Sequence, residues 1–311
     1  MKYKDWLKNW LENYVKVSSK HRTYMNYSEC VANHIAPNLG DYELNDLTPF
    51  KMQRFVTKLT ESGNLKTGCG LSSSTVNGII TIIQSSLETA YVVGALKEYP
   101  AHSIKRPKLD EDEVRCFSVA DQKKIESAIL GMGNKKQRMF GVILCLYTGL
   151  RIGELLALEW DDVDLQHGKI SITKTCYYGK NKQGVYCRIV DKPKTSSSKR
   201  IIPLPKQIVP LLKEQKKKSQ SIYVISNGSK PVSIRSYQES FSNLLKRIGI
   251  PHEGFHALRH TFATRAIECG MDVKSLSEIL GHKNPTITLK KYVHSLMEHK
   301  KDMMDKIGKM L

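Results

Sequence analysis

The segment HALRHTFAT, residues 256–264, places ionisable side chains among apolar, helix-forming ones. Residues three and four positions apart are neighbours on a helix, so His256, Arg259 and His260 are expected on one face. A buried arginine is rare unless a partner compensates its charge. The motif therefore raises the question of what the protein holds between these three cationic or proton-carrying groups.

The charge of the chain points to a polyanionic partner. Its 311 residues include 49 Lys and Arg against 30 Asp and Glu, which gives a net charge of +19. Such a surplus is typical of proteins that bind nucleic acid or an anionic membrane surface. Apolar runs such as GVILCLY fall far short of the ~20 residues of a membrane-spanning helix, and the N-terminus lacks the pattern of a signal peptide. We expect a cytoplasmic nucleic-acid-binding protein with no membrane partner; the alternative is a basic protein whose lysines are only solvated.

The cysteines argue against a metal site. There are seven, an odd number, and none forms a Cys-x-x-Cys pair, so zinc ligation and a disulfide framework are both disfavoured and reduced thiols are expected. Cys176 and Cys187 flank a predicted hairpin, where they either face each other or remain two unpaired thiols.

Residues 1–100 predict a small helical bundle. WLKNWLENYV and HRTYMNYSECVANHI carry aromatic and aliphatic residues at helical spacing, Thr48 precedes a proline at a first helical position, and SSSTVNGII begins with serine caps. AHSIKRPKLDEDEVRCFS, with its prolines and charge clusters, predicts an extended linker over residues 101–117. Ser118 then caps a new helix, with Asp121 three residues on.

The remainder predicts a mixed unit, so the expected fold class is mainly α with a small β-sheet. Helices are expected at about 119–130 and 136–147, in GELLALEW and from about 205, and short strands in KISITKT, VYCRIV, KRIIPL and SIYVI. Between Lys169 and Arg200 there are nine Lys or Arg and one acid, an excess of eight. We expect a basic hairpin there, turned by Gly179 and Gly184 in YYGKNKQG, that either lies on a polyanion or is simply solvated.

Four separated segments, TGLRIGELLALEW, KPKTSSSKRIIPL, HALRHTFAT and LGHKNPTITLKKYVH, hold groups suited to attack on a DNA phosphodiester. Arg151 and Arg259 would grip the non-bridging oxygens, since guanidinium groups stay charged and bind them bidentately. Tyr292 would be the nucleophile, because a phenol is a good leaving group in the reverse reaction. The remaining roles are proton transfers, by His256 and His282, and protonation of the departing 5′ oxygen by Lys194.

Each residue also has an ordinary explanation. A single tyrosine usually packs and a single histidine usually lies satisfied in a core. Arg151 is three residues from Glu154, a common surface pair on a helix. Lys174 in ITKT competes with Lys194 as the general acid. The specificity lies in the set and its order along the chain.

That set resembles the tyrosine recombinases, also called the phage integrase family. TGLRIGELLALEW is similar to the first-arginine box, with Glu154 as its supporting acid, and HALRHTFAT to the His-x-x-Arg-His box, with His260 as a supporting residue. LGH with a tyrosine ten residues later matches His282 and Tyr292, and PKTSSSKRIIPL favours Lys194 over Lys174. The rivals are a type IB topoisomerase that only relaxes DNA and a non-catalytic DNA-binding protein of the same fold.

The resemblance implies a C-shaped clamp on double-stranded DNA, a 3′-phosphotyrosine intermediate and a homo-tetramer, without metal, ATP or other cofactor. It also implies a mobile element of prophage or conjugative-transposon type in a bacterium, association with the nucleoid, and an excisionase or directionality factor as a partner. Many such integrases begin with an arm-binding domain; here the chain either uses simple core sites or is truncated.

The expected domains are a SAM-like core-binding domain at 1–100, the linker, a catalytic domain at 118–295 and a C-terminal tail at 296–311. An apolar stripe in the tail at Met297, Met304, Ile307 and Leu311 either docks on a neighbouring protomer or folds back onto its own domain. Further DNA contacts are expected at Arg22, Lys66, Ser73, Asn77, Lys174, Lys180, Lys182 and Arg200.

Overall fold

The computed structural model describes residues 1–109, 115–133, 136–181, 183–191, 199–282, 284–292, 304–305 and 308, with only the backbone of 136, 287 and 290–292. The chain divides into two compact units, Met1–Asp112 and Glu113–Leu311, each with its own apolar core. No helix in this described part is both long and apolar enough to cross a membrane.

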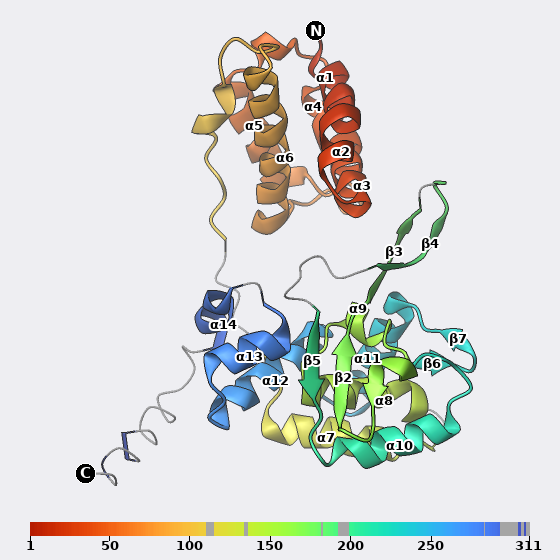
Figure 1. Cartoon of the computed structure of the whole chain (residues 1–311). Coiled ribbons are helices and arrows are strands. Elements are labelled where there is room, and N and C mark those ends of the chain that lie inside the picture. Colours follow the sequence, from red (N-terminus) through yellow and green to blue (C-terminus); the bar gives the residue numbers. More distant parts are fainter. Residues whose placement is uncertain are drawn as a thin grey trace. The chain divides into compact units, whose positions relative to one another are not determined.

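The first unit is a helical bundle (Figure 1). Its helices are α1 (Tyr3–Trp10), α2 (Lys16–Ser18), α3 (His21–Cys30), α4 (Ala36–Leu39), α5 (Pro49–Ser62) and α6 (Ser73–Val92), with π-helical turns η1 (Leu11–Val15) and η2 (Val31–Ile35) and 3-10 turns η3 (Leu44–Asp46) and η4 (Pro100–Ser103). Trp6 and Trp10 are buried, and their indoles donate to the Ser86 carbonyl and the Thr89 hydroxyl of α6. The helices expected in WLKNWLENYV and HRTYMNYSECVANHI are confirmed, each continuing through a π-helical turn.

The caps of the first unit follow the sequence signals. Thr48 Oγ1 accepts from the Lys51 amide at the start of α5, and Ser72 Oγ accepts from the Thr75 amide at the start of α6.

The linker starts later than the prolines suggested. Ala101 and Ile104 are buried in the core of the first unit, and the Arg106 guanidinium donates to Thr81 and Gln84 of α6. Residues 101–106 therefore belong to the first unit, because Ala101 and Ile104 lie in its core and Arg106 is bonded to α6.

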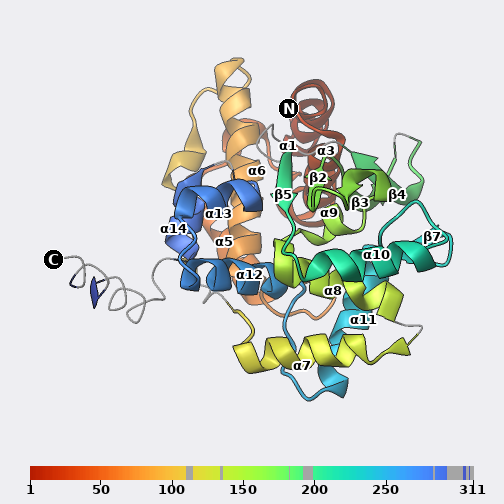
Figure 2. The ribbon, with the colours of Figure 1, turned by 60° about the horizontal axis from the view of Figure 1, so that its bottom comes forward.

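The second unit packs helices around small antiparallel sheets, which confirms the mainly α fold class with a small β component (Figures 1 and 2). Its helices are α7 (Val119–Leu130), α8 (Lys136–Thr148), α9 (Ile152–Leu155), α10 (Ile208–Lys218), α11 (Ile234–Arg247), α12 (His256–Glu268), α13 (Val273–Leu280) and α14 (Pro285–Tyr292), with a 3-10 turn η6 (Trp160–Asp162). Its strands are β1 (Val163–Asp164), β2 (Lys169–Ile172), β3 (Thr175–Lys180), β4 (Tyr186–Asp191), β5 (Arg200–Pro203), β6 (Ser226–Asn227) and β7 (Lys230–Pro231).

Helix α8 runs through the core of this unit. Its residues from Met139 to Leu146 are all buried, and a helix that is apolar on every side must be surrounded by other elements. Helix α12 packs against α8, and the three-stranded sheet of order β1-β2-β5 brings Ile170 and Ile202 into the same core. This packing brings Arg259, on α12, to the C-terminal end of α8.

The basic hairpin is present, but its details differ from the expectation. KISITKT is broken after Ile172, so β2 joins the three-stranded sheet whereas β3 pairs only with β4. Gly179 lies inside β3 opposite Cys187, and the turn uses Gly184 at φ 78°. The hairpin projects from the body of its unit (Figure 1).

Of the two alternatives for Cys176 and Cys187, the structure has the unpaired thiols: strand register places Cys176 opposite Val190 rather than Cys187, and both thiols are free. The strand expected in SIYVI was wrong, because this segment forms only an isolated bridge from Tyr223 to Glu159 and the strand β6 begins after it.

The start of α7 provides a direct test of the cap assignment. Ser118 Oγ accepts from the Asp121 amide at 3.0 Å and donates to its carboxylate at 2.7 Å. Ser118→Ala should lower the free energy of unfolding of the second unit by ~1 kcal/mol, measured by urea denaturation. Ser118→Asn, which keeps an accepting oxygen, is the matched control. Equal stability of the two variants would contradict the cap.

Candidate active site

The first arginine box forms a tight turn between two helices. Helix α8 ends at Thr148, and Gly149 follows with φ 64°, a conformation that glycine adopts without strain. Leu150 is buried, and Arg151 forms a capping box with Glu154 at the start of α9. The turn thus fixes the backbone of Arg151 while its side chain stays 36% exposed.

Glu154 is the buried anion of the site. Its side chain is only 4% exposed and accepts from the Arg151 backbone amide at 3.0 Å and from Nη1 of the same residue at 2.9 Å. The pair is therefore not the ordinary surface pair that its spacing also allowed. Burial acts to raise the pKa of Glu154, but the hydrogen bond and charge of Arg200, with the charge of Arg151, hold that pKa below its usual value.

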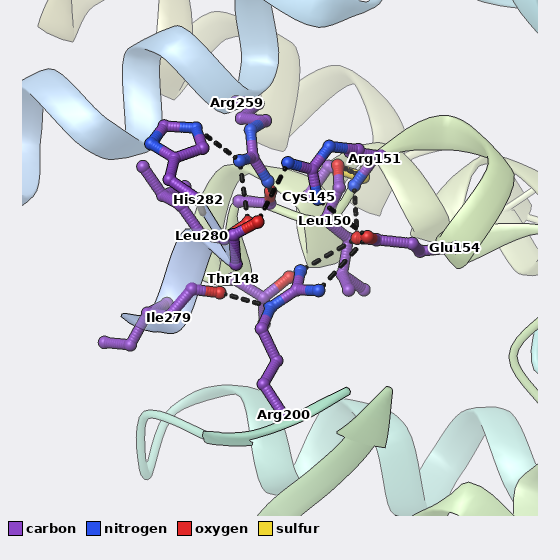
Figure 3. A network of polar contacts seen from close by, with 12 residues as sticks. Cys145, Thr148, Leu150, Arg151, Glu154, Arg200, Arg259, Ile279, Leu280 and His282 are labelled. Atoms are coloured by element: carbon purple, nitrogen blue, oxygen red, sulfur yellow. Dashed lines mark hydrogen bonds and ion pairs between the residues drawn. The ribbon is translucent and has the colours of Figure 1, made fainter. Parts of the chain in front are cut away.

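Arg259 is buried and is held by backbone carbonyls. Its side chain lies in the core at 2% exposure, with Nη1 donating to the Gly149 carbonyl at 2.8 Å and Nη2 to the Leu280 carbonyl at 2.7 Å (Figure 3). These carbonyls lie at the C-terminal ends of α8 and α13, where helix dipoles concentrate partial negative charge. Arg259 therefore joins two turns that are distant in sequence.

His282 completes this contact. Its Nε2 lies 2.9 Å from Arg259 Nη2, and its Nδ1 lies 2.7 Å from Thr288 Oγ1. A guanidinium group can only donate, so Nε2 accepts and a neutral ring carries its proton on Nδ1, which donates to Thr288. Thr288 was not among the residues expected from sequence; a buried threonine one helical turn before a tyrosine has no distinctive signal.

The other two histidines lie on the same helix as Arg259. The His256 ring is exposed and meets the His260 ring edge-on, with centroids 4.7 Å apart. Arg259 points into the core between these positions. His256, Arg259 and His260 of the HALRHTFAT segment are thus neighbours, and His256 faces solvent.

The nucleophile and general-acid candidates are only partly described. Tyr292 is the last residue of α14, which packs against α13 and α12, and its side chain lies outside the described residues. Lys194 and Lys182 also lie outside them, as does most of the tail at 296–311. No group of His, Cys, Asp or Glu in the described part could hold a metal ion.

Lys174, the rival general acid, is engaged elsewhere. Its ammonium pairs with Glu159 and with Asp162, the latter at 3.3 Å. Partial burial acts to lower the pKa of Lys174, but these two carboxylates raise it above the ordinary value. A lysine held by two carboxylates is a poor proton donor, which argues against Lys174 as the general acid.

Comparison with known proteins identifies the family. The model of the phage integrase family matches residues 108–299, and that of the phage integrase N-terminal SAM-like domain matches residues 2–60. The chain belongs to the phage integrase family. The resemblance drawn from the motifs is confirmed, and the chain is a tyrosine recombinase, an enzyme that transesterifies DNA strands.

Relatives of this integrase family member cover nearly all of it. A tyrosine recombinase XerC-like protein of Caldanaerobacter subterraneus subsp. tengcongensis is 28% identical over 98% of this chain and 82% of its own. The ICEBs1 integrase of Bacillus subtilis is 25% identical over 95% and 80%. The Tn1549 transposon integrase, solved with transposon right end DNA, has the same fold, with a TM-score of 0.83 at 22% identity over 99% of this chain and all of that one.

The expected DNA contacts of this integrase fall into two groups. Arg22, Lys66 and Lys180 are exposed, and Ser73 is half-buried at the start of α6. Three others have internal partners: Lys174 in the ion pairs described above, Asn77, which donates to the Pro107 carbonyl at 3.1 Å, and Arg200, which is buried against Glu154. The expectation for Arg200 was wrong, because a cation in a basic stretch was taken to face solvent when it faces a buried carboxylate.

The turn that holds Arg259 can be tested through Gly149. A Cβ there would lie 2.6 Å from the Phe262 ring and 2.8 Å from Leu280, in addition to the positive φ. Gly149→Ala should displace the carbonyl that holds Arg259 and slow DNA cleavage by on the order of 10²-fold, the effect of a misplacement of ~1 Å.

Gly168→Ala is the matched control for this variant. Gly168 also has positive φ, at 59°, but a Cβ there meets nothing closer than 3.7 Å. Both variants carry the backbone strain of about 1–2 kcal/mol, and only the Gly149 variant should lose single-turnover cleavage. Equal cleavage by the two proteins would show that the turn does not position Arg259.

Proposed function

We propose that this protein is the integrase of a mobile element, which joins and releases DNA at specific sites through a 3′-phosphotyrosine intermediate on Tyr292. The observation that carries the proposal is the pair of arginines at the helix ends. Arg259 is anchored by the Gly149 and Leu280 carbonyls, and Arg151 donates to the Gly281 carbonyl at 3.3 Å. Two guanidinium groups held on adjacent carbonyls suit the oxygens of one phosphate.

The roles follow from the charge that develops at phosphorus. Arg151 and Arg259 stabilise the non-bridging oxygens of the pentacoordinate transition state, where fixed donors act most strongly. His282, whose Nε2 accepts from Arg259 in the DNA-free protein, and His256 are the groups that we propose move or share protons at the phosphate. Lys194 protonates the 5′ oxygen as it leaves.

The partners of the proposed reaction are a DNA duplex and further copies of the chain. The Tn1549 integrase structures are complexes with DNA, and a lambda integrase structure is a tetramer bound to a Holliday junction. We propose the same assembly for this chain, a C-shaped clamp and a homo-tetramer on DNA, assisted by an excisionase or directionality factor, in the cytoplasm at the bacterial nucleoid. The net charge of +19 supports a polyanionic partner.

The nucleophile is tested by removing one oxygen. Tyr292→Phe should bind its site with unchanged affinity but form no covalent adduct, because phosphate contacts supply most of the binding energy. The measurement is a denaturing gel after incubation with a nicked suicide substrate, beside a gel shift. Tyr223→Phe, at a half-buried tyrosine of the same unit, is the control. An adduct that persists in the Tyr292 variant would remove this residue from the role.

The general acid is tested with a modified substrate. A sulfur in place of the 5′-bridging oxygen makes a leaving group that needs no proton. Lys194→Ala should cleave the ordinary substrate slowly and the sulfur substrate at nearly the wild-type rate, whereas Arg151→Ala should stay slow on both. Rescue of Lys174→Ala in place of Lys194→Ala would move the general acid to Lys174, against the ion pairs that hold it.

A further inference from the structure

Three arginines meet the last turn of α13. The carbonyl of Ile279 accepts from Arg200 Nε, that of Leu280 from Arg259 Nη2, and that of Gly281 from Arg151 Nη2 (Figure 3). The final carbonyls of a helix have no partner within the helix and carry partial negative charge. The last turn of α13 therefore attracts cations, and three consecutive carbonyl groups each accept a hydrogen bond from one arginine.

Gly281 makes this arrangement possible. It ends α13 with φ 64°, and a Cβ at this position would lie 3.0 Å from Arg200 Nη1 and 3.1 Å from its Cδ. The Arg200 side chain thus packs directly on the glycine. The chain reversal at Gly281 also directs His282 back towards Arg259.

Arg200 and Glu154 form a bidentate pair away from solvent. Arg200 Nη1 lies 3.1 Å from Oε1 and Nη2 lies 2.8 Å from Oε2 of the carboxylate. The two side chains are only 5% and 4% exposed. Such planar, two-point contacts fix both partners more rigidly than a single ammonium would.

Glu154 consequently lies between two guanidinium groups. The guanidinium group of Arg151 meets it through Nη1 alone, at 2.9 Å, while this side chain remains 36% exposed. Without Arg200, the buried carboxylate would be left with Arg151 as its main compensating cation in the described structure, and would draw that side chain inward. Removing one partner of a buried pair leaves the other charge strongly destabilised.

We infer that Arg200 is a positioning residue for strand cleavage, which acts through Glu154 and the α13 end to hold Arg151 towards the scissile phosphate. The inference rests on the proposed role of Arg151. Arg200 is not assigned any contact with a reacting atom. Its contribution is the geometry of Arg151, so its loss affects the rate of cleavage more than the affinity for DNA.

The test compares Arg200→Gln and Arg200→Lys with wild type on a nicked suicide substrate under single-turnover conditions. Arg200→Gln should slow formation of the Tyr292 adduct by on the order of 10²-fold, as for a misplaced catalytic group, while gel-shift affinity falls much less. Arg200→Lys keeps the charge and loses the two-point contact, so it should recover part of the rate. Arg235→Gln, which breaks a surface arginine–glutamate pair of 2.9 Å at a side chain 92% exposed, is the matched control and should cleave like wild type.

A double-mutant cycle separates positioning from general loss of structure. If Arg200 acts through Glu154, adding Arg200→Gln to Glu154→Gln should slow cleavage little beyond the effect of Glu154→Gln alone. Additive losses, wild-type cleavage by Arg200→Gln, or equal losses in cleavage and affinity would each overturn the inference.

Melting curves establish which variants fold; if Arg200→Gln does not, Arg200→Lys carries the test, and wild-type cleavage by that variant would overturn the inference. A wild-type protein that forms no adduct on any substrate would instead be a failure of the proposed function.

Discussion

The buried guanidinium of Arg259 is the constraint on which the site depends. A cation at 2% exposure must be compensated, and here the compensation comes from the carbonyls of Gly149 and Leu280 and from the His282 ring. These partners come from two turns that lie 110 residues before it and 21 residues after it. The hydrogen bonds that compensate the charge of Arg259 in the core therefore also bring the first arginine box and the LGH segment together in one site.

Two helix ends and one buried carboxylate supply the negative charge that faces the arginines of this site. The C-terminal ends of α8 and α13 hold Arg259, and the last turn of α13 also receives Arg151 and Arg200. A single described carboxylate, Glu154, balances two of these cations. The described arginines thus exceed the carboxylates beside them, which leaves a net positive site suited to a phosphate diester while each guanidinium is fixed before DNA arrives.

The local signals in the sequence were sufficient for the caps, most helices and the recognition that Arg259 lies among apolar residues and needs a partner. They were insufficient for its partners, because backbone carbonyls carry no residue-type signature and distant turns are brought together only by packing on α8. Arg200 was taken for a DNA contact since every cation in a basic stretch looks alike in sequence. KISITKT was interpreted as one strand because it is short and contains β-branched residues, although Lys174 at the break pairs with Glu159 and Asp162.

We propose that Arg151 and Arg259, held on the helix ends, bind one scissile phosphate that Tyr292 attacks. A crystal structure of the protein with nicked DNA and orthovanadate, whose trigonal bipyramid mimics the pentacoordinate phosphate, tests this arrangement. We expect vanadium bonded to Tyr292 Oη, both guanidinium groups within about 3 Å of its equatorial oxygens, and Arg259 still bonded to the Gly149 and Leu280 carbonyls. Vanadate bound without Tyr292, or contacted by neither arginine, would contradict it.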